Sequence, residues 1–382
     1  MDIVFIHHQI RFSEAEWRLL SPASKGIAPL QADDWEVIRF CQQWRQGQAA
    51  FTLQTSGSTS KPKPIQVQRS QMQASAQATL QALAKHTAPI SSALLCLNPA
   101  FIAGKMMMVR ALVGQFDLFV LPPSSAVLAK LPADVTIGLA AMVPLQIQTC
   151  LPDALLLEKL NGFQAVLVGG ASVGYALKYA IQQEVLAPVW ATFGMTETVS
   201  HIALQRLNGA SPQDTFEVLP QIEIKQNEAG CLCIKGAVTL DQWIETNDQV
   251  ELIGATQFKW LGRLDWVVNS GGIKIQIESV EAVLAQWFFE QGFTFRFFCG
   301  GIPDEQLGER LCLVVENFEP TQVWCSALWK ALEVKLPRFY IPKGIVVLTH
   351  FTETPTAKLN RKAMLQQIAI QQLPLLPLKK LD

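Results

Sequence analysis

The run FTLQTSGSTSKPKP, residues 51–64, joins two apolar segments and contains three Thr, three Ser, one Gly and two Lys. Residues of these kinds form flexible linkers, and they also form loops that surround phosphate groups. The run is not a Walker A loop, because the required spacing of two glycines and a lysine is absent. It is not a dinucleotide fingerprint either, since Gly57 is its only glycine.

The segments on either side of this run favour a phosphate loop. AAFTLQ before it has the pattern of a short strand, and SQMQASAQATLQALAKH after Arg69 has the pattern of a helix that opens on Ser70. A polar loop between a strand and a helix can surround an anion with backbone N–H groups and hydroxyls, and Lys61 and Lys63 would add positive charge. Two interpretations remain at this point, a solvated turn and a phosphate-binding loop.

The composition predicts a globular protein with a large core. Of its 382 residues, 49% are hydrophobic and 16% are charged, which is enough for two or three domains. A net charge of −1 gives no electrostatic footprint for nucleic acid, so we expect no such partner. The sequence shows neither a signal peptide nor an uncharged apolar run of about 18 residues, the length of a membrane span. We therefore expect a cytoplasmic protein without a membrane span, and the sequence leaves open whether it forms a homo-oligomer.

The cysteines and histidines carry no recognisable metal or disulfide signature. The eight cysteines include no C-x-x-C pair, and the five histidines show no ligand spacing. Cys231 and Cys233 alternate within an expected strand and should share one face. We expect buried free thiols, and neither structural zinc nor disulfides.

Strand-like and helix-like segments alternate through the first two-thirds of the chain. The expected strands are short apolar runs that end in turn residues, namely SALLCLN, FDLFVLP, VTIGLA, QAVLVGG and PVWATFG. Between the last two, SVGYALKYAIQQEVL has a helical pattern. This alternation predicts an α/β fold whose largely parallel sheet is covered on both faces. Ligands of such sheets bind beyond the carboxyl ends of the strands, where the loops at 169–172 and 193–198 would lie.

The character of the sequence changes twice toward the C-terminus. From Ile222 onward, IEIKQ, GCLCIKG and FKWLGRL have the pattern of antiparallel strands. After Asp265 we expect a compact α+β unit that contains the helix SVEAVLAQWFFEQ and the strands FRFFCGG and RLCLVVE. The prediction is a large N-terminal α/β domain over residues 1–264, followed by a small α+β domain over residues 265–382.

Six motifs occur in one order along the chain: TSGSTSKPK, GGA, TFGMTET, Asp248, GRLDWVVNSGGIKI and PTAKLNRK. Together they resemble the motifs of the adenylate-forming superfamily, which includes acyl-CoA synthetases, adenylation domains of peptide synthetases, and luciferases. The resemblance extends from Phe51 to about Met364. It implies a large domain with a small mobile C-terminal lid domain. It also implies a reaction in which a carboxylate attacks the α-phosphate of ATP and pyrophosphate leaves.

The resemblance assigns the opening run to the polyphosphate of ATP. The family loop that embraces the β- and γ-phosphates is matched here by Thr55, Ser56, Gly57, Ser58, Thr59 and Lys63. Ser60 and Pro64 depart from the family, in which glycine is usual at both positions. The hydroxyls and Lys63 that would bind the phosphates are retained.

The middle motifs would bind the rest of the nucleotide and a metal ion. Glu197 matches the family glutamate that binds Mg²⁺, a cation that prefers carboxylate and phosphate oxygens. Thr196 matches the threonine that contacts the α-phosphate. The adenine side is matched by Gly169, Gly170, Ala171, Gly194 and Phe193, the last in place of a common tyrosine. Taken singly, each motif would also fit an ordinary turn.

The later motifs would complete the site and move the lid domain. Asp248 aligns with the aspartate that accepts from the ribose hydroxyls, and Arg263 with a second ribose or phosphate contact. Asp265 takes the place of the hinge between the domains. Lys358 aligns with the lysine that bridges the carboxylate and the α-phosphate, although Ala357 replaces the usual glycine before it. Two glycines match the loop that lines the site of the second step, thioester formation with coenzyme A: Gly271 and Gly272.

Within the family, the short form of the chain resembles o-succinylbenzoate–CoA ligases of menaquinone biosynthesis. The phosphate loop lies much closer to residue 1 than in typical members, so we expect an N-terminally shortened large domain. NPAFIAGKMMMVRAL looks like the substrate-side segment of those ligases, with Phe101 in the place of a histidine of longer relatives. Lys105 and Arg110 are candidates to meet a second carboxylate of the acid, although methionines at such spacing also fit a core helix. Three alternatives stay open: another small acyl- or aryl-CoA ligase, an adenylating enzyme that loads a carrier protein, and a nucleotide-binding protein without turnover.

Overall fold

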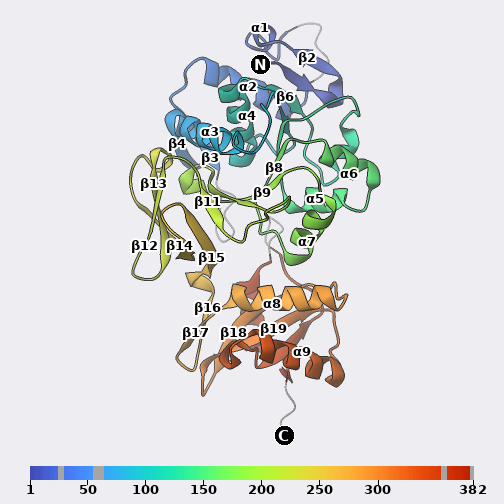
Figure 1. Cartoon of the computed structure of the whole chain (residues 1–382), viewed down its shortest axis with the longest axis vertical. Helices are drawn as coiled ribbons and strands as arrows, with labels where there is room; N and C mark the ends of the chain where they lie inside the picture. Colours follow the sequence, from blue (N-terminus) through green and yellow to red (C-terminus); the bar gives the residue numbers. More distant parts are fainter. Residues whose placement is uncertain (25–29, 55–63, 354–358, 379–382) are drawn as a thin grey trace.

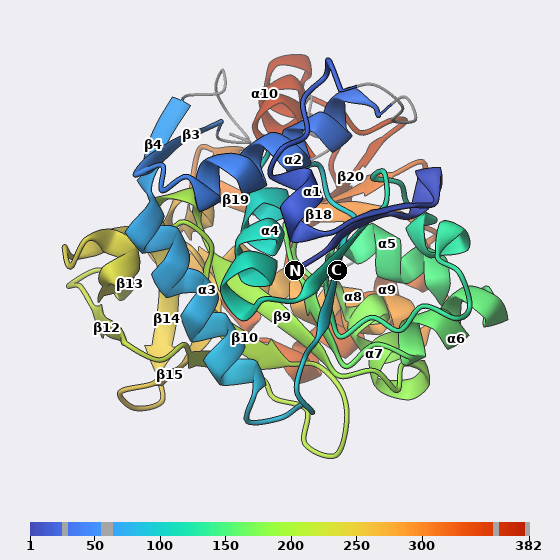
Figure 2. The ribbon, with the colours of Figure 1, turned by 90° about the horizontal axis from the view of Figure 1, so that it is seen from above.

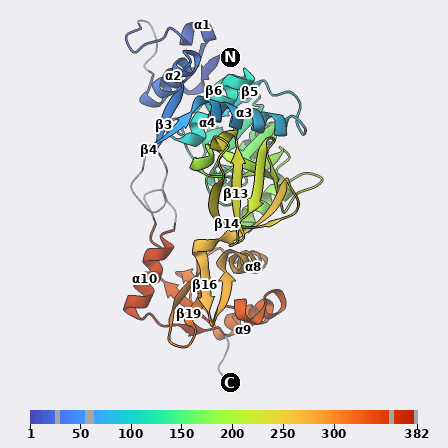
Figure 3. The same cartoon turned by 90° about the vertical axis from the view of Figure 1, so that its left-hand side faces the viewer.

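A computed structural model describes residues 1–24, 30–54, 64–353 and 359–378 of the chain (Figure 1). The described residues form a sheet of 13 strands, a later sheet of six strands and a separate two-stranded hairpin. The larger sheet lies in the N-terminal part of the chain and the smaller one in the C-terminal part, as Figure 3 shows from the side. This is the α/β fold with a large N-terminal and a small C-terminal α+β unit that the sequence predicts.

The centre of the large sheet is parallel and covered on both faces. Its parallel strands are, in sheet order, β9 (Val189–Gly194), β8 (Ala165–Val168), β7 (Leu139–Met142), β5 (Ser92–Leu95), β6 (Asp117–Val120) and β1 (Ile3–Phe5). Every residue of β5 and β8 is buried, as expected for strands between two layers of helices. Along β5, Ala93 and Leu95 face one core cluster and Leu94 the other.

Helices from different parts of the chain cover the two faces of this sheet (Figure 2). One layer consists of α2 (Ala32–Arg45), α3 (Arg69–Leu83) and α4 (Ile102–Gly114). The other consists of α5 (Pro144–Cys150), α6 (Ala154–Asn161) and α7 (Tyr175–Glu184). At the far edge, β2 (Ile10–Phe12) pairs with β1 and is followed by α1 (Glu14–Trp17).

Beyond β9 the sheet continues as antiparallel strands. In sheet order they are β10 (His201–Arg206), β11 (Phe216–Val218), β15 (Gln257–Arg263), β14 (Ile244–Leu252), β13 (Cys231–Gly236) and β12 (Ile222–Gln226). Cys231 and Cys233 lie on β13, and all eight cysteines are buried, as expected. Among the described residues, no helix is both long and apolar enough to cross a membrane.

Three residues, the turn Leu264–Trp266, separate the end of β15 from the start of the second sheet. Its strands are β16 (Val267–Ser270), β17 (Ile273–Gln276), β18 (Phe297–Asp304), β19 (Gly308–Glu316), β20 (Gly344–Leu348) and β21 (Leu376–Pro377). One core cluster packs it against α8 (Ile277–Glu290) and α9 (Gln322–Lys335), and a second one against α10 (Arg361–Gln371). The change of sheet therefore coincides with the position predicted for a hinge.

The surroundings of the run 51–64 differ from the prediction. The expected strand is β3 (Ala50–Gln54), but it pairs antiparallel with β4 (Pro64–Gln68), so residues 55–63 connect two strands of a hairpin and not a strand and a helix. The helix α3 then begins at Arg69 and not at Ser70, and the Gln71 side chain accepts the Gln68 N–H at 2.9 Å. The short, polar strand PIQVQ carries too little apolar pattern to stand out in the sequence.

Candidate functional site

The loops that follow β8 and β9 lie side by side at the carboxyl edge of the parallel strands. Val168 pairs with Ala191 in parallel register, so Gly169 and Gly194 leave the sheet at the same edge. The Thr192 hydroxyl donates to Val168 O at 3.2 Å, and a Cβ placed on Gly169 would lie 2.2 Å from that hydroxyl oxygen. The close approach of two strand ends therefore requires glycine at 169. This edge is where open α/β sheets bind ligands.

The described part of the adenine-side motif occupies this edge. Gly170, in a left-handed conformation with φ of +81°, and Ala171 are exposed beyond Gly169. Phe193 is half-buried, and its ring packs at 5.1 Å from Phe258 and 5.5 Å from Phe216. The structure thus brings Gly169, Gly170 and Ala171 together with Phe193 and Gly194, as predicted.

The predicted metal and phosphate residues lie in a strained turn between β9 and β10. Val199 has φ of +68° and ψ of −50°, and Ser200 N–H bonds to Thr198 O at 2.7 Å, which is the geometry of a tight γ-turn. Such a conformation costs a β-branched residue on the order of 1–3 kcal/mol and is found mainly at functional sites. The buried Thr198 hydroxyl holds the turn through Met195 O at 3.0 Å and Ser200 O at 2.8 Å.

This turn presents Thr196 and Glu197 to solvent. Thr196 is half-buried, and the Glu197 carboxylate is exposed and has no ion-pair partner within residues 1–24, 30–54, 64–353 and 359–378. A free carboxylate on a fixed backbone is a suitable ligand for a hard cation such as Mg²⁺. The local geometry therefore fits the metal-binding role that the sequence predicts.

A buried chain of polar side chains supports the turn from below. Arg110 of α4 donates to Ser200 Oγ at 3.1 Å and to His201 Nδ1 at 3.4 Å. Because Nδ1 faces a guanidinium, the proton of His201 is on Nε2, which donates to Thr79 Oγ1 at 2.9 Å, and Thr79 in turn donates to Ser75 O at 2.9 Å. Burial, and then the charge of Arg110, hold the His201 pKa well below its ordinary value.

The same network leaves the Arg110 charge without a balancing anion among the residues that the structure describes. The side chain is 2% exposed, burial lowers its pKa to about 10, and its Nε has no hydrogen-bond partner among the described residues. Lys105, one turn earlier on α4, differs: its Nζ lies 2.6 Å from Glu36 Oε1 and 5.2 Å from the Phe40 ring centre. Lys105 is thus paired with Glu36 in this structure, whereas its contact with a substrate carboxylate stays a prediction.

The predicted ribose residues lie on adjacent strands of the antiparallel part. Asp248 of β14 pairs with Arg263 of β15, and its Oδ1 accepts from Trp260 Nε1 at 2.9 Å. Burial raises the pKa of Asp248, against the opposing effects of Trp260 and Arg263. Arg263 forms a two-bond pair with Asp265 at 2.9 and 3.1 Å, and this hydrogen bonding raises its pKa. Asp248 thus keeps one carboxylate oxygen that the Trp260 bond does not use.

The turn between the sheets is tied to the start of α8. Gln276 Nε2 donates to Arg263 O at 3.1 Å, and Arg263 N donates to Glu278 Oε1 at 3.1 Å. Gly262 has φ of +144°, and a Cβ there would lie 2.0 Å from Gln276 Nε2. The chain therefore crosses from one sheet to the other at Gly262, and two hydrogen bonds between Arg263 and the start of α8 hold the crossing.

Gly271 and Gly272 belong to the small sheet and are not joined to the β8–β9 edge. Gly271 and Gly272 close the β16–β17 hairpin with φ of +60° and +80°, where Gly271 N bonds to Leu307 O at 2.8 Å. Within the described part of the chain, no hydrogen bond or ring contact joins this hairpin to the loops of β8 and β9. Seven predicted residues lie outside the described residues: Thr55, Ser56, Gly57, Ser58, Thr59, Lys63 and Lys358.

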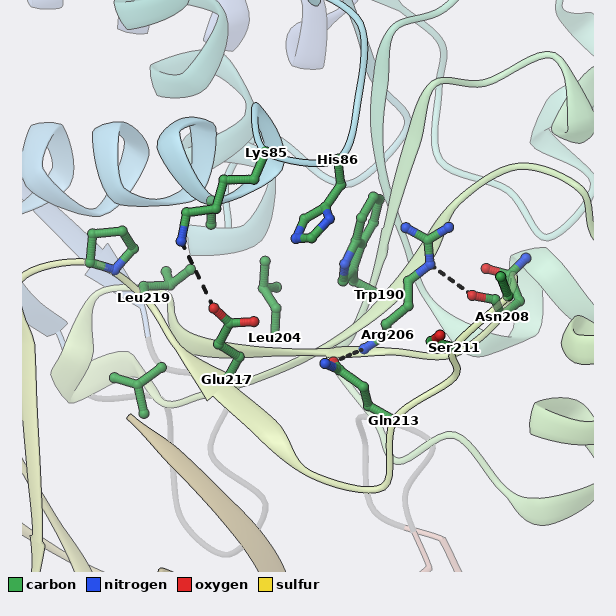
Figure 4. Close-up of a pocket in the computed structure, with 14 residues that line it drawn as sticks. Lys85, His86, Trp190, Leu204, Arg206, Asn208, Ser211, Gln213, Glu217 and Leu219 are labelled. Carbon is green, nitrogen blue, oxygen red and sulfur yellow. Dashed lines mark hydrogen bonds and ion pairs between the residues drawn. The ribbon is translucent and has the colours of Figure 1, made fainter. Parts of the chain in front are cut away.

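A separate cavity of about 380 Å³ opens at the other end of β9 and β10 (Figure 4). Trp190 pairs with Arg206 at this end, and the guanidinium lies 4.4 Å from the indole ring centre. Its rim also includes Lys85 and His86, which follow α3, and Glu217 of β11. None of the predicted site residues that the structure describes belongs to its lining. The cavity and the β8–β9 edge are therefore different places on the large sheet.

His201 and Thr79 are the polar residues at this site that the sequence does not reveal. They are 122 residues apart, and nothing in the local sequence of α3 or β10 indicates that they meet. The only sequence signal is a polar pair within otherwise apolar segments, and many unrelated positions share it.

Comparison with known proteins identifies a family and a number of similar chains. A family model described as AMP-binding enzyme matches residues 12–239. A crystal structure of an acyl-CoA synthetase (AMP-forming)/AMP-acid ligase II-like protein from Dyadobacter fermentans is 38% identical, covers 89% of this chain and 95% of that one, and superimposes with a TM-score of 0.59.

Two curated ligases are also similar. A 2-succinylbenzoate–CoA ligase of Geobacillus sp. (strain WCH70) is 26% identical over 388 residues, which is 90% of this chain and 74% of that one. A 2-hydroxy-7-methoxy-5-methyl-1-naphthoate–CoA ligase of Streptomyces carzinostaticus is 31% identical over 129 residues, and the match spans 34% of this chain but only 22% of that protein.

Proposed function

Because this chain belongs to the family of AMP-binding enzymes, we propose that it is an acid–CoA ligase that first joins a carboxylic acid to AMP and then transfers the acyl group to coenzyme A. The acid we propose is o-succinylbenzoate, which has one carboxylate that would be activated and a second one that would stay free. Support comes from the 26% identity to a 2-succinylbenzoate–CoA ligase over 90% of this chain.

The observation that carries this proposal is the uncompensated charge of Arg110. A buried guanidinium without a carboxylate is costly, and a bound dicarboxylic acid would supply the missing charge. Arg110 lies beside Ser200, four residues after the threonine proposed to face the α-phosphate. An acid bound there would have one carboxylate near Thr196 and the other near Arg110.

The proposed roles of the remaining residues follow the reaction. Thr55–Thr59 and Lys63 hold the polyphosphate, Asp248 and Arg263 the ribose, and Gly169–Ala171 with Phe193 and Gly194 the adenine. Glu197 holds Mg²⁺, which neutralises charge on the phosphates when it is bound. Thr196 and Lys358 stabilise the charge that develops on the α-phosphate and orient the attacking carboxylate.

The second step requires a different arrangement of the small unit. Lys358 is proposed to leave the site as the segment around Asp265 rotates, and Gly271 and Gly272 then come to the β8–β9 edge. This fits the place where Gly271 and Gly272 lie in the present arrangement, on a hairpin that does not contact that edge among the described residues.

An aryl-CoA ligase with a monocarboxylic substrate is the second candidate, favoured by the 31% identity to a naphthoate–CoA ligase over 129 residues. The two candidates are separated by measuring pyrophosphate release with o-succinylbenzoate, benzoate, naphthoate and a medium-chain fatty acid, each with and without coenzyme A. We expect o-succinylbenzoate to be used best and thioester to form only with coenzyme A. Faster turnover of a monocarboxylic acid would favour the second candidate.

A further inference from the structure

Two consecutive imidazoles and a buried carboxylate converge at the N-terminal edge of the large sheet, away from the β8–β9 loops. His7 and His8 end a short 3₁₀ turn (Ile6–His8) between β1 and β2, and Asp34 lies in the first turn of α2. His7 Nε2 is 3.1 Å from Asp34 Oδ1, and His8 Nε2 is 3.0 Å from Asp34 Oδ2. The three donor atoms all lie within 4.8 Å of one another.

Local structure holds each of these groups in place. Gln9 closes the 3₁₀ turn with φ of +55°, and the two imidazole rings lie 4.0 Å apart at 44° to each other, so both Nε2 atoms face the same carboxylate. Phe5 packs edge-on against His7 at 6.1 Å. On the other side, Asp34 Oδ2 accepts the Gln31 N–H at 2.9 Å, which fixes the carboxylate at the start of α2.

No lysine or arginine that the structure describes forms an ion pair with this cluster. Asp34 is 3% exposed, and its only ion-pair partners in the described ranges are the two imidazoles. Nearby acids are paired differently: Glu36 has Lys105, and Glu14 has Arg45. A buried carboxylate without a fixed counter-charge is costly unless a cation is supplied.

We propose that His7 Nε2, His8 Nε2 and Asp34 bind a zinc ion, with water as the fourth ligand. Ligands at about 2.0–2.1 Å around a tetrahedral zinc lie about 3.3 Å apart, close to the observed nitrogen–oxygen distances of 3.0 and 3.1 Å. Imidazole and carboxylate are ligands that zinc accepts, and the 10% and 15% exposure of the two histidine side chains provides a path for the ion and the water. The ion would cross-link the β1–β2 hairpin to α2, so the site stabilises the fold and takes no part in catalysis.

Direct zinc binding to the full chain tests this proposal. Chelator-treated protein is titrated with zinc chloride by calorimetry, and Co²⁺ is added in a parallel experiment to record the visible absorption bands of a nitrogen- and oxygen-coordinated ion. We expect one equivalent to bind, a zinc-dependent rise in Tm, and loss of both in His8→Gln. Asp34→Asn should also lose binding, but it changes the start of α2, so His8→Gln is the decisive variant. His86→Gln and His350→Gln, which change exposed histidines elsewhere, should bind like the original chain.

Each outcome decides the proposal. The rise in Tm on adding zinc is measured within each variant, so a variant with lower basal stability still gives a result. Equal binding by His8→Gln and the original chain would mean an adventitious ion only and would overturn the proposal. Absence of zinc binding to the original chain would overturn it as well. Neither result bears on the ligase activity, because no residue of this cluster belongs to the site proposed for it.

Discussion

The Arg110 guanidinium lies 3.1 Å from the Ser200 hydroxyl and thereby joins the core helix α4 to the turn that carries Thr196 and Glu197. The helix and the turn are 90 residues apart in the sequence. A charge buried at this junction without an anionic partner among the described residues is a stability cost that a substrate carboxylate would remove. Five predictions follow from this arrangement and from the proposed roles of its neighbours.

Arg110→Met should reduce kcat/KM for o-succinylbenzoate far more than for benzoate. Loss of a charge-assisted hydrogen bond to the second carboxylate lowers the rate constant roughly 10- to 100-fold. Steady-state pyrophosphate release with both acids gives the comparison. Arg206→Met is the control, since Arg206 is a half-buried arginine at the other end of β10. Equal losses with both acids would mean that Arg110 acts only on the fold.

Glu197→Gln should raise the Mg²⁺ concentration that activity requires, without unfolding the chain. The amide keeps the shape of the exposed side chain but removes the charge that would hold the ion. The Mg²⁺ concentration for half-maximal activity should rise about tenfold or more. Loss of a side chain that only orients a metal ligand already lowers metal affinity about 10- to 100-fold, and Glu197 is proposed to be a ligand itself. Activity measured against Mg²⁺ concentration tests this, with Glu217→Gln at the separate cavity as control. Unchanged Mg²⁺ dependence would show that another group holds the ion.

Gly169→Ala should destabilise the β8–β9 edge and weaken ATP binding. The added Cβ would lie 2.2 Å from Thr192 Oγ1, so the hydroxyl must move and lose its bond to Val168 O. The expected loss is about 1–3 kcal/mol in the free energy of unfolding. Thr192→Ala should relieve most of the clash in the double variant. Gly174→Ala, where a Cβ would meet nothing within 4 Å, is the control. A double variant as unstable as Gly169→Ala would contradict this reading of the contact.

The stability of the chain should fall below about pH 6.5 in part because of His201. Its pKa in the folded chain lies well below the ordinary value of 6.5. At a pH between the folded-state pKa and the ordinary pKa, the unfolded chain binds a proton at His201 and the folded chain does not. A falling pH therefore favours unfolding. The slope from this group approaches about 1.4 kcal/mol per pH unit. Denaturant unfolding of the original chain and His201→Gln from pH 7.5 to 5 should show their difference in stability shrinking as pH falls. A constant difference would contradict it.

Lys358→Ala should separate the two half-reactions. The lysine is proposed to stabilise charge during adenylation only, so its loss should slow that step by roughly 10²-fold or more. Conversion of a pre-formed acyl-adenylate with coenzyme A should stay nearly unchanged. Single-turnover assays of each step compare the variant with Lys362→Ala, which changes an exposed lysine four positions later. Equal slowing of both steps in a folded variant would contradict the proposed rotation of the small unit.

The fold and one edge of the site were predictable because their signals are local. The strands β8 and β9 appear as short apolar runs, and the loops after them meet at the carboxyl edge of any parallel sheet. The hairpin of β3 and β4 was missed, because β4 is polar and begins with proline.

Contacts between distant elements could not be predicted from the sequence. Lys105 and Arg110 lie on the same helix and looked equivalent, and only the packing of α2 shows that Glu36 neutralises the first and nothing described neutralises the second. The strained Val199 turn and its support by His201 depend on α3 and α4 together. The cluster of His7, His8 and Asp34 had no recognisable spacing, because 26 residues separate His8 from the carboxylate.

The most direct test of the central claim is to observe the acyl-adenylate itself. The protein, at a concentration above that of the acid, is mixed with ATP, Mg²⁺ and o-succinylbenzoate without coenzyme A, quenched, and analysed by mass spectrometry before and after a chase with coenzyme A. The account predicts that o-succinylbenzoyl-AMP accumulates with one pyrophosphate per adenylate, and that the chase converts it to the thioester with release of AMP. Thioester formation that releases ADP and phosphate, or no adenylate with any acid of the panel, would contradict it.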